Sequence, residues 1–392
     1  LTLGVFTIAA VGGMFFTNIV TTEMTLPIII SILRSLEEAG VLRYEEEENP
    51  DNIDRPFPSR TASCYLIGAT YCASIGGTAT VTGCGTNLAT RNFINMYFPL
   101  ALQYYMSYQM WFAACFVVAV VEVFIVWIWL NVSMLGLFWE NRSDPEIKEI
   151  NPYEFEAHAR EIVTQLHDEM GPMKASEILV ASVYPILILL WLFRNPIHFD
   201  GIMWVLATIF SPSALLNSID YITDVCFGII MVLFLGSLPS TMEFATFCKS
   251  ENKNRPKKRS PPILEFKPFT KKVNWFTFVT MGGGFALIRA MQDSDFLLLI
   301  NMNFIKDLSP GIIMLFFCFA TVLLTQIINN TALLFIIMPI AARVATLAGV
   351  TEFHIIVCVG VSCSLCFLLP IASVPNRIMY SKAKIPLKDL VS

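Results

Sequence analysis

Two short polar segments, far apart in the chain, place asparagine inside long apolar stretches. The first is Thr17-Asn18-Ile19 and the second is Asn329-Asn330-Thr331. Asn18 and Asn330 are 312 positions apart, and the prolines that follow them, Pro27 and Pro339, are separated by the same 312. An asparagine amide offers hydrogen-bond donors to a carboxylate and an acceptor to a cation. Paired tips of this kind predict a site for an anion together with a small cation.

A second pair of segments follows the two tips at a matching interval. One runs over residues 76–87 and is rich in glycine and threonine, and the other runs over 368–376 and holds two prolines. Their closing residues, Asn87 and Asn376, are 289 positions apart, 23 fewer than the tips, and the hydrophilic stretch 37–60 accounts for that difference. Glycine and proline interrupt helices. Each half is therefore predicted to contain a hairpin-like tip and then a broken helix.

The elements that carry these segments are predicted to cross a membrane. The chain of 392 residues is 55% hydrophobic and 15% charged, with a mean hydropathy of +0.62. A soluble domain averages about 25% charged residues. Charge-free runs extend over 61–90, 92–121 and 308–342, longer than the roughly 20 residues that span the hydrocarbon core. Shorter runs cover 178–193, 201–219, 225–242 and 353–376. The predicted fold class is an all-α polytopic membrane protein.

Other classes of function have little support in the sequence. A net charge of −5 and one short basic run argue against a nucleic-acid partner. Ten cysteines are scattered singly, and the pair Cys363 and Cys366 lies in an apolar span of a chain with four histidines, so packing is favoured over metal or redox chemistry. Neither a GxSxG elbow nor an HExxH zinc motif occurs, so we expect no enzyme and no cofactor.

Three hydrophilic stretches divide the spans. The stretch 37–60 is acidic, 140–177 has helix-like apolar spacing typical of an amphipathic surface helix, and 249–272 is strongly basic. The positive-inside rule places the basic stretch in the cytoplasm, and an even number of spans places 140–177 there too. The predicted organisation is a first-repeat part over 1–137, with a tip at 13–28 and a broken helix at 61–95; a cytoplasmic amphipathic linker over 138–177; and a second-repeat part over 178–392, with spans at 178–242, a basic cytoplasmic loop at 249–272, a hairpin at 275–348 and a broken helix at 353–380.

Broken helices at membrane depth are costly unless the freed backbone groups line a cavity or are buried in protein. Paired interruptions in two halves are typical of repeat-built secondary transporters, with the site near the midplane. Half-helix N-termini suit carboxylates, and half-helix C-termini and unwound carbonyls suit Na⁺. The alternative for any single Asn-Thr pair is a polar contact between helices. Two tips in register favour transport.

The motifs around these segments resemble those of the divalent-anion:sodium symporter family, solute carrier family 13, and most of all its insect, INDY-type branch. The similar stretches are ASIGGTAT at 73–80, GGGFAL at 282–287 and SVPN at 373–376. The resemblance covers nearly the whole chain. It implies two inverted repeats with re-entrant hairpins, an elevator-type movement, a homodimer in the cell membrane, and the absence here of the family's first helices and its last one.

The resemblance also implies which residues form the site. Sodium would be held in a first site by Gly13, Thr17, Asn18 and Gly83, and in a second by Thr325, Ile328, Asn330 and Ala372. The anion would be bound by Thr17, Asn18, Thr86, Asn87, Asn330, Thr331, Ser373, Pro375 and Asn376.

The tips depart from the family pattern in ways that bear on sodium. Gly13 and Asn329 stand where serine is usual, and the first tip has Thr17 for serine and Ile19 for threonine. Thr86 replaces a proline. Lost hydroxyls leave fewer oxygen ligands for Na⁺. We therefore predict sodium-coupled transport of succinate, citrate and related anions, with three alternatives: a sodium-independent dicarboxylate exchanger, a sulfate carrier, or a relative that no longer transports. The expected partners are carboxylate anions, Na⁺, membrane lipid and a second copy of the chain.

Two carboxylates inside apolar segments are further candidates. Glu23 lies six positions beyond Thr17, and Glu122 is flanked by Val121 and Val123. Ionisable residues at membrane depth are functional candidates by default. For Glu23 the alternative to a role near the site is surface exposure.

Overall fold

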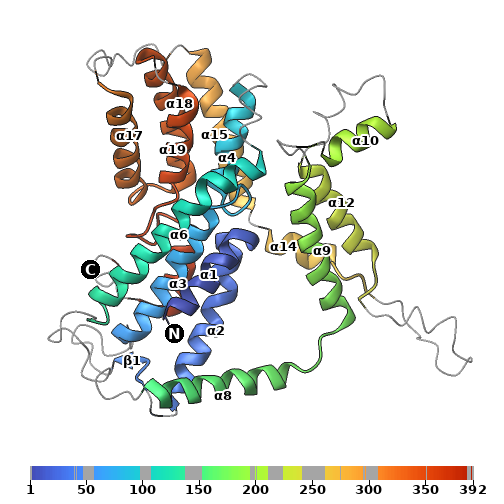
Figure 1. The fold of residues 1–392 in the computed structure, drawn as a ribbon, viewed down its shortest axis with the longest axis vertical. Coiled ribbons are helices and arrows are strands. Elements are labelled where there is room, and N and C mark those ends of the chain that lie inside the picture. Colours follow the sequence, from blue (N-terminus) through green and yellow to red (C-terminus); the bar gives the residue numbers. More distant parts are fainter. Residues whose placement is uncertain are drawn as a thin grey trace, which may run out of the picture. The chain divides into compact units, whose positions relative to one another are not determined.

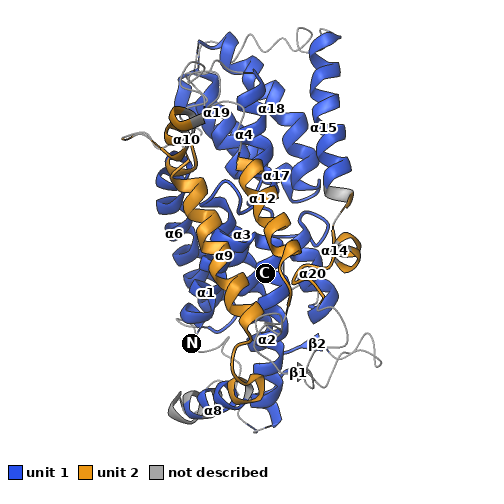
Figure 2. Cartoon of the chain, turned by 90° about the vertical axis from the view of Figure 1, so that its right-hand side faces the viewer, with its two compact units in different colours: residues 1–106, 110–165, 276–392 blue, residues 107–109, 166–275 orange. Residues whose placement is uncertain are grey.

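The computed structural model describes residues 2–38, 40, 42–46, 57–97, 107–136, 152–194, 199, 201–210, 224–240, 261–273, 275–294, 296, 308–349, 351–385 and 390. Across these residues the chain is almost entirely helical, which confirms the predicted class. The one sheet in the described part pairs β1 (Glu45–Glu46) with β2 (Phe57–Pro58), antiparallel, with Glu45 opposite Pro58. The chain divides into two compact units (Figure 2).

Unit 1 comprises residues 1–106, 110–165 and 276–392. Its helices are α1 (Thr2–Phe16), α2 (Asn18–Glu38), α3 (Arg60–Thr78), α4 (Gly85–Tyr97), most of α6 (Tyr108–Ser133) and of α8 (Pro152–Met170), most of α15 (Trp275–Asp293), α17 (Pro310–Thr325), α18 (Asn330–Leu347), α19 (Glu352–Ser362) and α20 (Val374–Ala383) (Figure 1).

Helix α3 forms the centre of unit 1. Every residue from Ala62 to Thr78 is buried, and the side chain of Ser59 caps the helix by accepting from the Ala62 N–H. Glycines let α1 approach it closely: a Cβ at Gly76 would lie 2.0 Å from the carbonyl oxygen of Ala10. Small residues at such contacts allow membrane helices to pack backbone to backbone.

The short helices that follow the two breaks pack on the opposite half of unit 1. Helices α1 and α2 contact α3, while α17 and α18 contact α19. Helix α4 contacts α18 and α19, and α20 contacts α2 and α3. Figures 1 and 2 show α4, α17, α18 and α19 at one end of unit 1 and α1, α2 and α3 at the other. The two halves are therefore interlocked by their broken helices.

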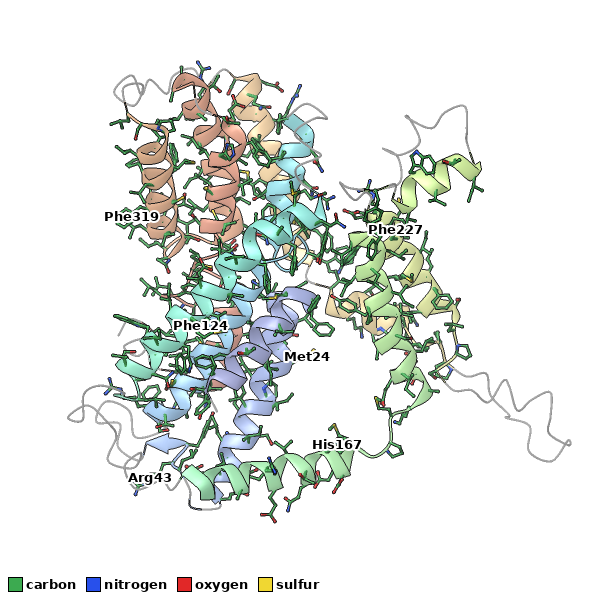
Figure 3. All side chains as sticks on the ribbon, viewed as in Figure 1. Met24, Arg43, Phe124, His167, Phe227 and Phe319 are labelled. Carbon is green, nitrogen blue, oxygen red and sulfur yellow. The ribbon has the colours of Figure 1, made fainter. Side chains whose placement is uncertain are left out.

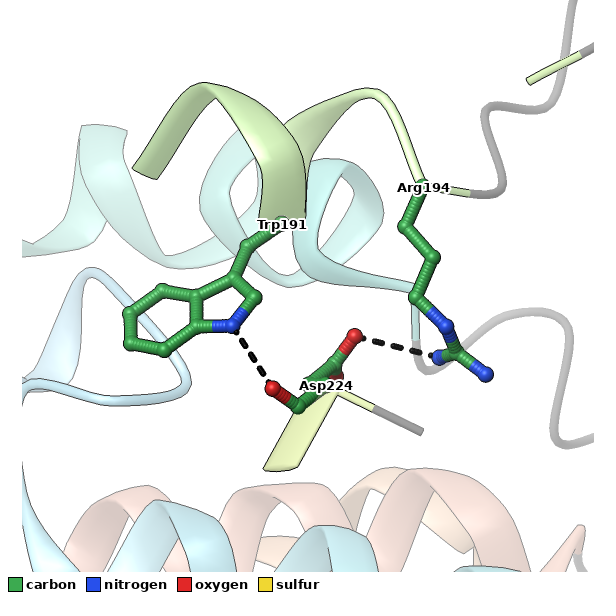
Figure 4. A network of polar contacts seen from close by, with 3 residues as sticks. All are labelled: Trp191, Arg194 and Asp224. Carbon is green, nitrogen blue, oxygen red and sulfur yellow. Dashed lines mark hydrogen bonds and ion pairs between the residues drawn. The ribbon is translucent and has the colours of Figure 1, made fainter. Parts of the chain in front are cut away.

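Unit 2 comprises residues 107–109 and 166–275 and includes α9 (Ala175–Leu192), α10 (Ile202–Phe210), α12 (Asp224–Ser237) and α14 (Phe266–Lys272). Helices α9 and α12 pack together. Two contacts tie the end of α9 to the start of α12: the Trp191 indole donates to the Asp224 carbonyl over 3.0 Å, and Arg194 pairs with the Asp224 carboxylate at 3.1 Å (Figure 4).

The described helices include several that suit a bilayer. Four are long and apolar enough to cross a membrane, namely α2, α6, α9 and α18, and shorter apolar helices are α1, α12, α17 and α19. Large apolar side chains on their outer faces are exposed, such as Phe124 of α6 and Phe319 of α17 (Figure 3). An apolar surface of this kind is unfavourable in water and suits lipid.

Several of the predicted segments can be located among the described residues. Helix α8 lies within the predicted linker 138–177, and most of its described side chains are exposed. Residues 241–260, which include the first half of the predicted basic loop, and 47–56 of the acidic stretch lie outside the described residues. The range 275–348 contains α15, α17 and α18, and the polar tip separates α17 from α18.

Candidate functional site

The first tip is a one-residue interruption between α1 and α2. Thr17 has φ 74°, a left-handed conformation that is uncommon for a β-branched residue. Its carbonyl accepts from the Thr21 N–H at 3.0 Å, which starts the next helix. The Asn18 N–H donates to the carbonyl of Gly83 at 2.9 Å. The tip therefore lies against the first break, residues 79–84 between α3 and α4.

The second tip makes the equivalent contact. Asn329 caps α18, because its side-chain oxygen accepts from the N–H groups of Thr331 and Ala332. The Asn330 N–H donates to the carbonyl of Ala372 at 3.1 Å, in the second break, residues 363–373 between α19 and α20. Gly83 and Ala372 are 289 positions apart, the same interval as Asn87 and Asn376. Tip and break thus meet at equivalent positions in both halves.

The side-chain amides of the two tips differ in their surroundings. Within the described residues, no hydrogen bond is made by the Asn18 side chain, which is 7% exposed. The Asn330 side-chain oxygen accepts from the Thr331 N–H at 2.8 Å and from the Thr331 hydroxyl at 3.3 Å. The Asn18 side-chain nitrogen and oxygen are therefore available to a ligand, whereas the Asn330 side-chain oxygen is already bonded to Thr331.

A buried hydroxyl contact connects the two breaks. The Thr86 hydroxyl, in the first turn of α4, lies 2.6 Å from the Ser364 hydroxyl. The Cys84 thiol lies 2.9 Å from Thr86 and 3.4 Å from Ser364. All three side chains are buried. Of the predicted anion ligands, Thr86 is thus already bonded within the protein.

The remaining predicted anion ligands lie at the start of α20 or beside the first break. Ser373 caps α20, since its hydroxyl accepts from the Asn376 N–H at 3.3 Å, and Pro375 occupies the first turn. Both are buried. The side chains of Asn87 and Asn376 are also buried, and their amide nitrogens donate to carbonyl groups of the breaks.

The predicted sodium ligands gather only in part. Thr17, Asn18 and Gly83 lie together at the first tip, and Asn330 and Ala372 lie together at the second. A Cβ at Gly13 would lie 2.1 Å from the carbonyl oxygen of Ala73, so no side chain fits there.

In the second set of predicted sodium ligands, two residues lie apart from the tip contact. The Thr325 hydroxyl donates to the Cys363 carbonyl at 3.1 Å, and Ile328 is partly exposed in the turn before the tip.

The tip contacts and the Thr86–Ser364 contact bring helix N-termini together. Helices α2 and α18 begin at the tips, and α4 and α20 begin two residues after Gly83 and Ala372. Helix N-termini carry unpaired N–H groups and a partial positive charge, which favour anions. The arrangement is therefore suited to binding an anion rather than to covalent chemistry.

Comparison with known proteins agrees with this geometry. The family model described as the sodium:sulfate symporter transmembrane region matches residues 1–392. The chain belongs to this family. It is a family of membrane transporters rather than enzymes, and the protein is a multi-pass integral membrane protein. The family predicted from the sequence motifs is confirmed.

Individual relatives in the family are distant but align along almost all of the chain. The Drosophila melanogaster protein "I'm not dead yet" is 26% identical over 389 residues, covering 96% of this chain and 64% of its own length. The human Na(+)/dicarboxylate cotransporter 3 is 25% identical, covering 100% and 70%, and the rat Na(+)/citrate cotransporter is 24% identical, covering 100% and 71%. The chain thus spans less than two thirds of the fly protein's length.

Several residues that connect tips and breaks were missed by sequence reasoning. Gln326 joins the second tip to the second break, since its amide donates to the Leu365 carbonyl at 2.8 Å and accepts from the Phe367 N–H at 2.9 Å. Ser364 and Cys84 were also missed. The available signal was a polar residue beside the second tip for Gln326, and a position inside a predicted broken helix for Ser364 and Cys84.

The two carboxylate candidates lie away from the tip contacts. The side chain of Glu23 is exposed on α2, and its backbone carbonyl accepts from the Lys382 ammonium at 3.3 Å. Glu122 is half-buried in α6, and one of its carboxylate oxygens has no hydrogen-bond partner among the described residues. For Glu23, the exposed side chain agrees with the alternative of surface exposure.

Proposed function

We propose that this protein is a secondary active transporter that carries di- or tricarboxylate anions, such as succinate and citrate, across the cell membrane. The observation that carries the proposal is the matched pair of tips, each a helix N-terminus bonded to the carbonyl of a broken helix. Two such tips provide two places for a carboxylate. The printed names of the human and rat relatives, a dicarboxylate and a citrate cotransporter, support this substrate class.

In the proposed binding mode, one carboxylate lies at each tip. The Asn18 amide, free of protein partners in the described part of the chain, binds the first carboxylate together with the N–H groups that begin α4. The Asn330 amide nitrogen binds the second, together with the Thr331 hydroxyl once that hydroxyl turns away from its 3.3 Å contact with the Asn330 side-chain oxygen. None of the described residues assigned here to the site is lysine or arginine, so backbone dipoles and neutral donors neutralise the anion. Weak, distributed binding of this kind allows release on the other side.

We also propose that the two halves are inverted repeats and that unit 1 includes the part that moves. The interlocked packing of α4 and α20 supports an internal symmetry axis between the halves. The homodimer and the elevator-type movement are also proposed, and both rest on the resemblance to the family.

Sodium is proposed as a co-transported ion because both human and rat relatives are named Na(+) cotransporters. The carbonyls of Gly83 and Ala372 and the side chain of Asn18 supply hard oxygen ligands of the kind Na⁺ needs. A second candidate, sodium-independent exchange, is favoured by Gly13, where the contact with Ala73 leaves no space for a ligating hydroxyl.

The test is uptake of labelled succinate, citrate and sulfate by oocytes that express the protein, with Na⁺ or choline outside. Succinate or citrate uptake supports the proposal, and its loss in choline supports sodium coupling. Uptake that persists in choline and is stimulated by internal dicarboxylate indicates an exchanger. Uptake of sulfate alone, or of none of the three anions, contradicts the proposed substrate class.

A further inference from the structure

The two break asparagines make one hydrogen-bond pattern in duplicate. The Asn87 amide nitrogen donates to carbonyls 10, 9 and 7 positions before it: Gly77 at 3.0 Å, Thr78 at 3.3 Å and Thr80 at 2.7 Å. The Asn376 amide nitrogen does the same at 10, 9 and 7 positions: Cys366 at 2.7 Å, Phe367 at 3.2 Å and Leu369 at 3.5 Å. The shared spacing indicates a shared task.

The role of the two asparagines follows from the hydrogen-bond donors that a broken helix is missing. Where a helix stops inside a membrane protein, its last carbonyls lose their intrahelical N–H partners and need others. The Asn87 amide supplies donors to the last two carbonyls of α3 and to Thr80 in the first break. The Asn376 amide supplies donors to three carbonyls within the second break. An aromatic side chain adds one more in each half: the Trp111 indole donates to Thr78 at 2.9 Å, and the Tyr71 hydroxyl donates to Phe367 at 2.7 Å. Thr78 and Phe367 are again 289 positions apart.

The same amides are poorly placed to touch a transported anion. Asn87 is 0% exposed and Asn376 is 1% exposed. Their nitrogens face carbonyl groups, while their side-chain oxygens have no hydrogen-bond partner among the described residues. A carboxylate needs donors, and the donors of these two amides are already in use.

The breaks that these amides hold are the surfaces that the tips contact. Gly83 lies in the first break and accepts from Asn18, and Ala372 lies in the second and accepts from Asn330. If a break changes shape, its carbonyl moves relative to the helix N-terminus that it fixes.

We propose that Asn87 and Asn376 are positioning residues that fix the two breaks, in place of the direct anion contact that the family resemblance implies. This inference rests on the proposed function for its transport consequences only. Each amide acts on its own half, so its loss loosens one break and one tip. The role depends on the amide donors, so aspartate, which keeps the oxygens and loses the donors, does not replace asparagine.

The test compares Asn87→Ala, Asn87→Asp, Asn376→Ala and Asn376→Asp with Asn131→Ala. Asn131 is a matched control, since it is a buried asparagine whose amide donates to Trp127 within α6, away from both breaks. The first readout is N-ethylmaleimide labelling in membranes, measured at each cysteine by mass spectrometry. Cys84 in the first break and Cys366 in the second are 3% and 2% exposed.

We expect the Asn87 variants to raise labelling of Cys84 severalfold and leave Cys366 unchanged, and the Asn376 variants to do the reverse. Tyr71→Phe removes a single donor from the second break, so it should raise labelling of Cys366 alone and by less, even if the asparagine variants fold poorly. Labelling that stays at the wild-type level in these variants, or rises equally at both cysteines, overturns the proposal.

The second readout is the transport efficiency for succinate, citrate and sulfate, corrected for surface expression. A positioning residue should lower it by at least about tenfold, or 1.4 kcal/mol, and by one common factor for every anion that the wild type carries. A change in the preference between anions, or wild-type efficiency in the aspartate variants, indicates direct contact and overturns the proposal. A wild type that carries none of the anions contradicts the proposed function, while the labelling still decides the positioning role.

Discussion

The close approach of α1 to α3 at Gly76 can be tested by adding one methyl group. In Gly76→Ala, the new Cβ would lie 2.0 Å from the Ala10 carbonyl oxygen and 2.7 Å from its carbon. Real Cβ contacts are almost never shorter than 3.0 Å, and both atoms belong to the backbone, so no rotation of a side chain relieves the clash. The contact must lengthen from 2.0 Å to at least 3.0 Å, so the two helices must separate.

The expected cost follows from overpacking a close contact, about 1–3 kcal/mol. The higher helix propensity of alanine offsets about 1 kcal/mol of this at most. The separation also displaces Gly77, whose carbonyl accepts from Asn87 and where an added Cβ would lie 3.3 Å from the Asn18 Cβ. We therefore expect substrate uptake to fall as well as stability.

The assay is the apparent melting temperature of the detergent-extracted protein, followed by size-exclusion fluorescence. A loss of 1 kcal/mol lowers the melting temperature by about 2–4 °C for domains of 150–250 residues, so we expect a fall of several degrees. The control is Gly4→Ala in α1, where nothing lies within 4 Å of the added atom. Equal melting temperatures for Gly76→Ala and Gly4→Ala would refute the predicted backbone contact.

Two further predictions concern buried polar contacts. Ser364→Ala removes the hydroxyl 2.6 Å from Thr86 and should lower the free energy of unfolding by about 1–3 kcal/mol. Adding Thr86→Val to this variant should then cost little more. Additive losses in melting temperature in the double variant would contradict a direct bond. Asp224→Asn in the partly buried pair with Arg194, whose side chains are 18% and 17% exposed, should cost about 1–2 kcal/mol. Asp293→Asn, in the exposed pair of Asp293 with Arg289 in α15, should lower the free energy of unfolding by about 0.5 kcal/mol or less. Equal falls in melting temperature for Asp224→Asn and Asp293→Asn would contradict the greater contribution expected of the less exposed pair.

The parts of the fold that could be predicted from sequence are those that depend on composition or on position along the chain. Long charge-free runs require lipid, so the helical membrane class followed directly. The intervals of 312 and 289 positions could be read from Asn18, Asn330, Asn87 and Asn376 because asparagine is rare at membrane depth and costly without a partner. The structure gives the same intervals to the contacts with Gly83 and Ala372.

The parts that could not be predicted depend on contacts between distant segments. Nothing in the sequence pairs Thr86 with Ser364, 278 positions away, or Tyr71 with Phe367, 296 positions away. The direction of the Asn87 amide was equally hidden, since residue type alone does not say which atoms a buried amide bonds. Gly13 could be recognised as a departure from the family, but the reason it excludes a side chain is the position of Ala73.

The central claim is that the two tips bind the transported anion, and the most direct test is concentration-dependent uptake of labelled succinate or citrate by Asn18→Ala and Asn330→Ala. Asn131→Ala is again the matched control for a buried asparagine outside the site. We predict that each tip variant reaches the cell surface but loses at least about tenfold in transport efficiency, as expected when a charge-assisted hydrogen bond to a carboxylate is removed. Uptake at the wild-type level in both tip variants would contradict the account.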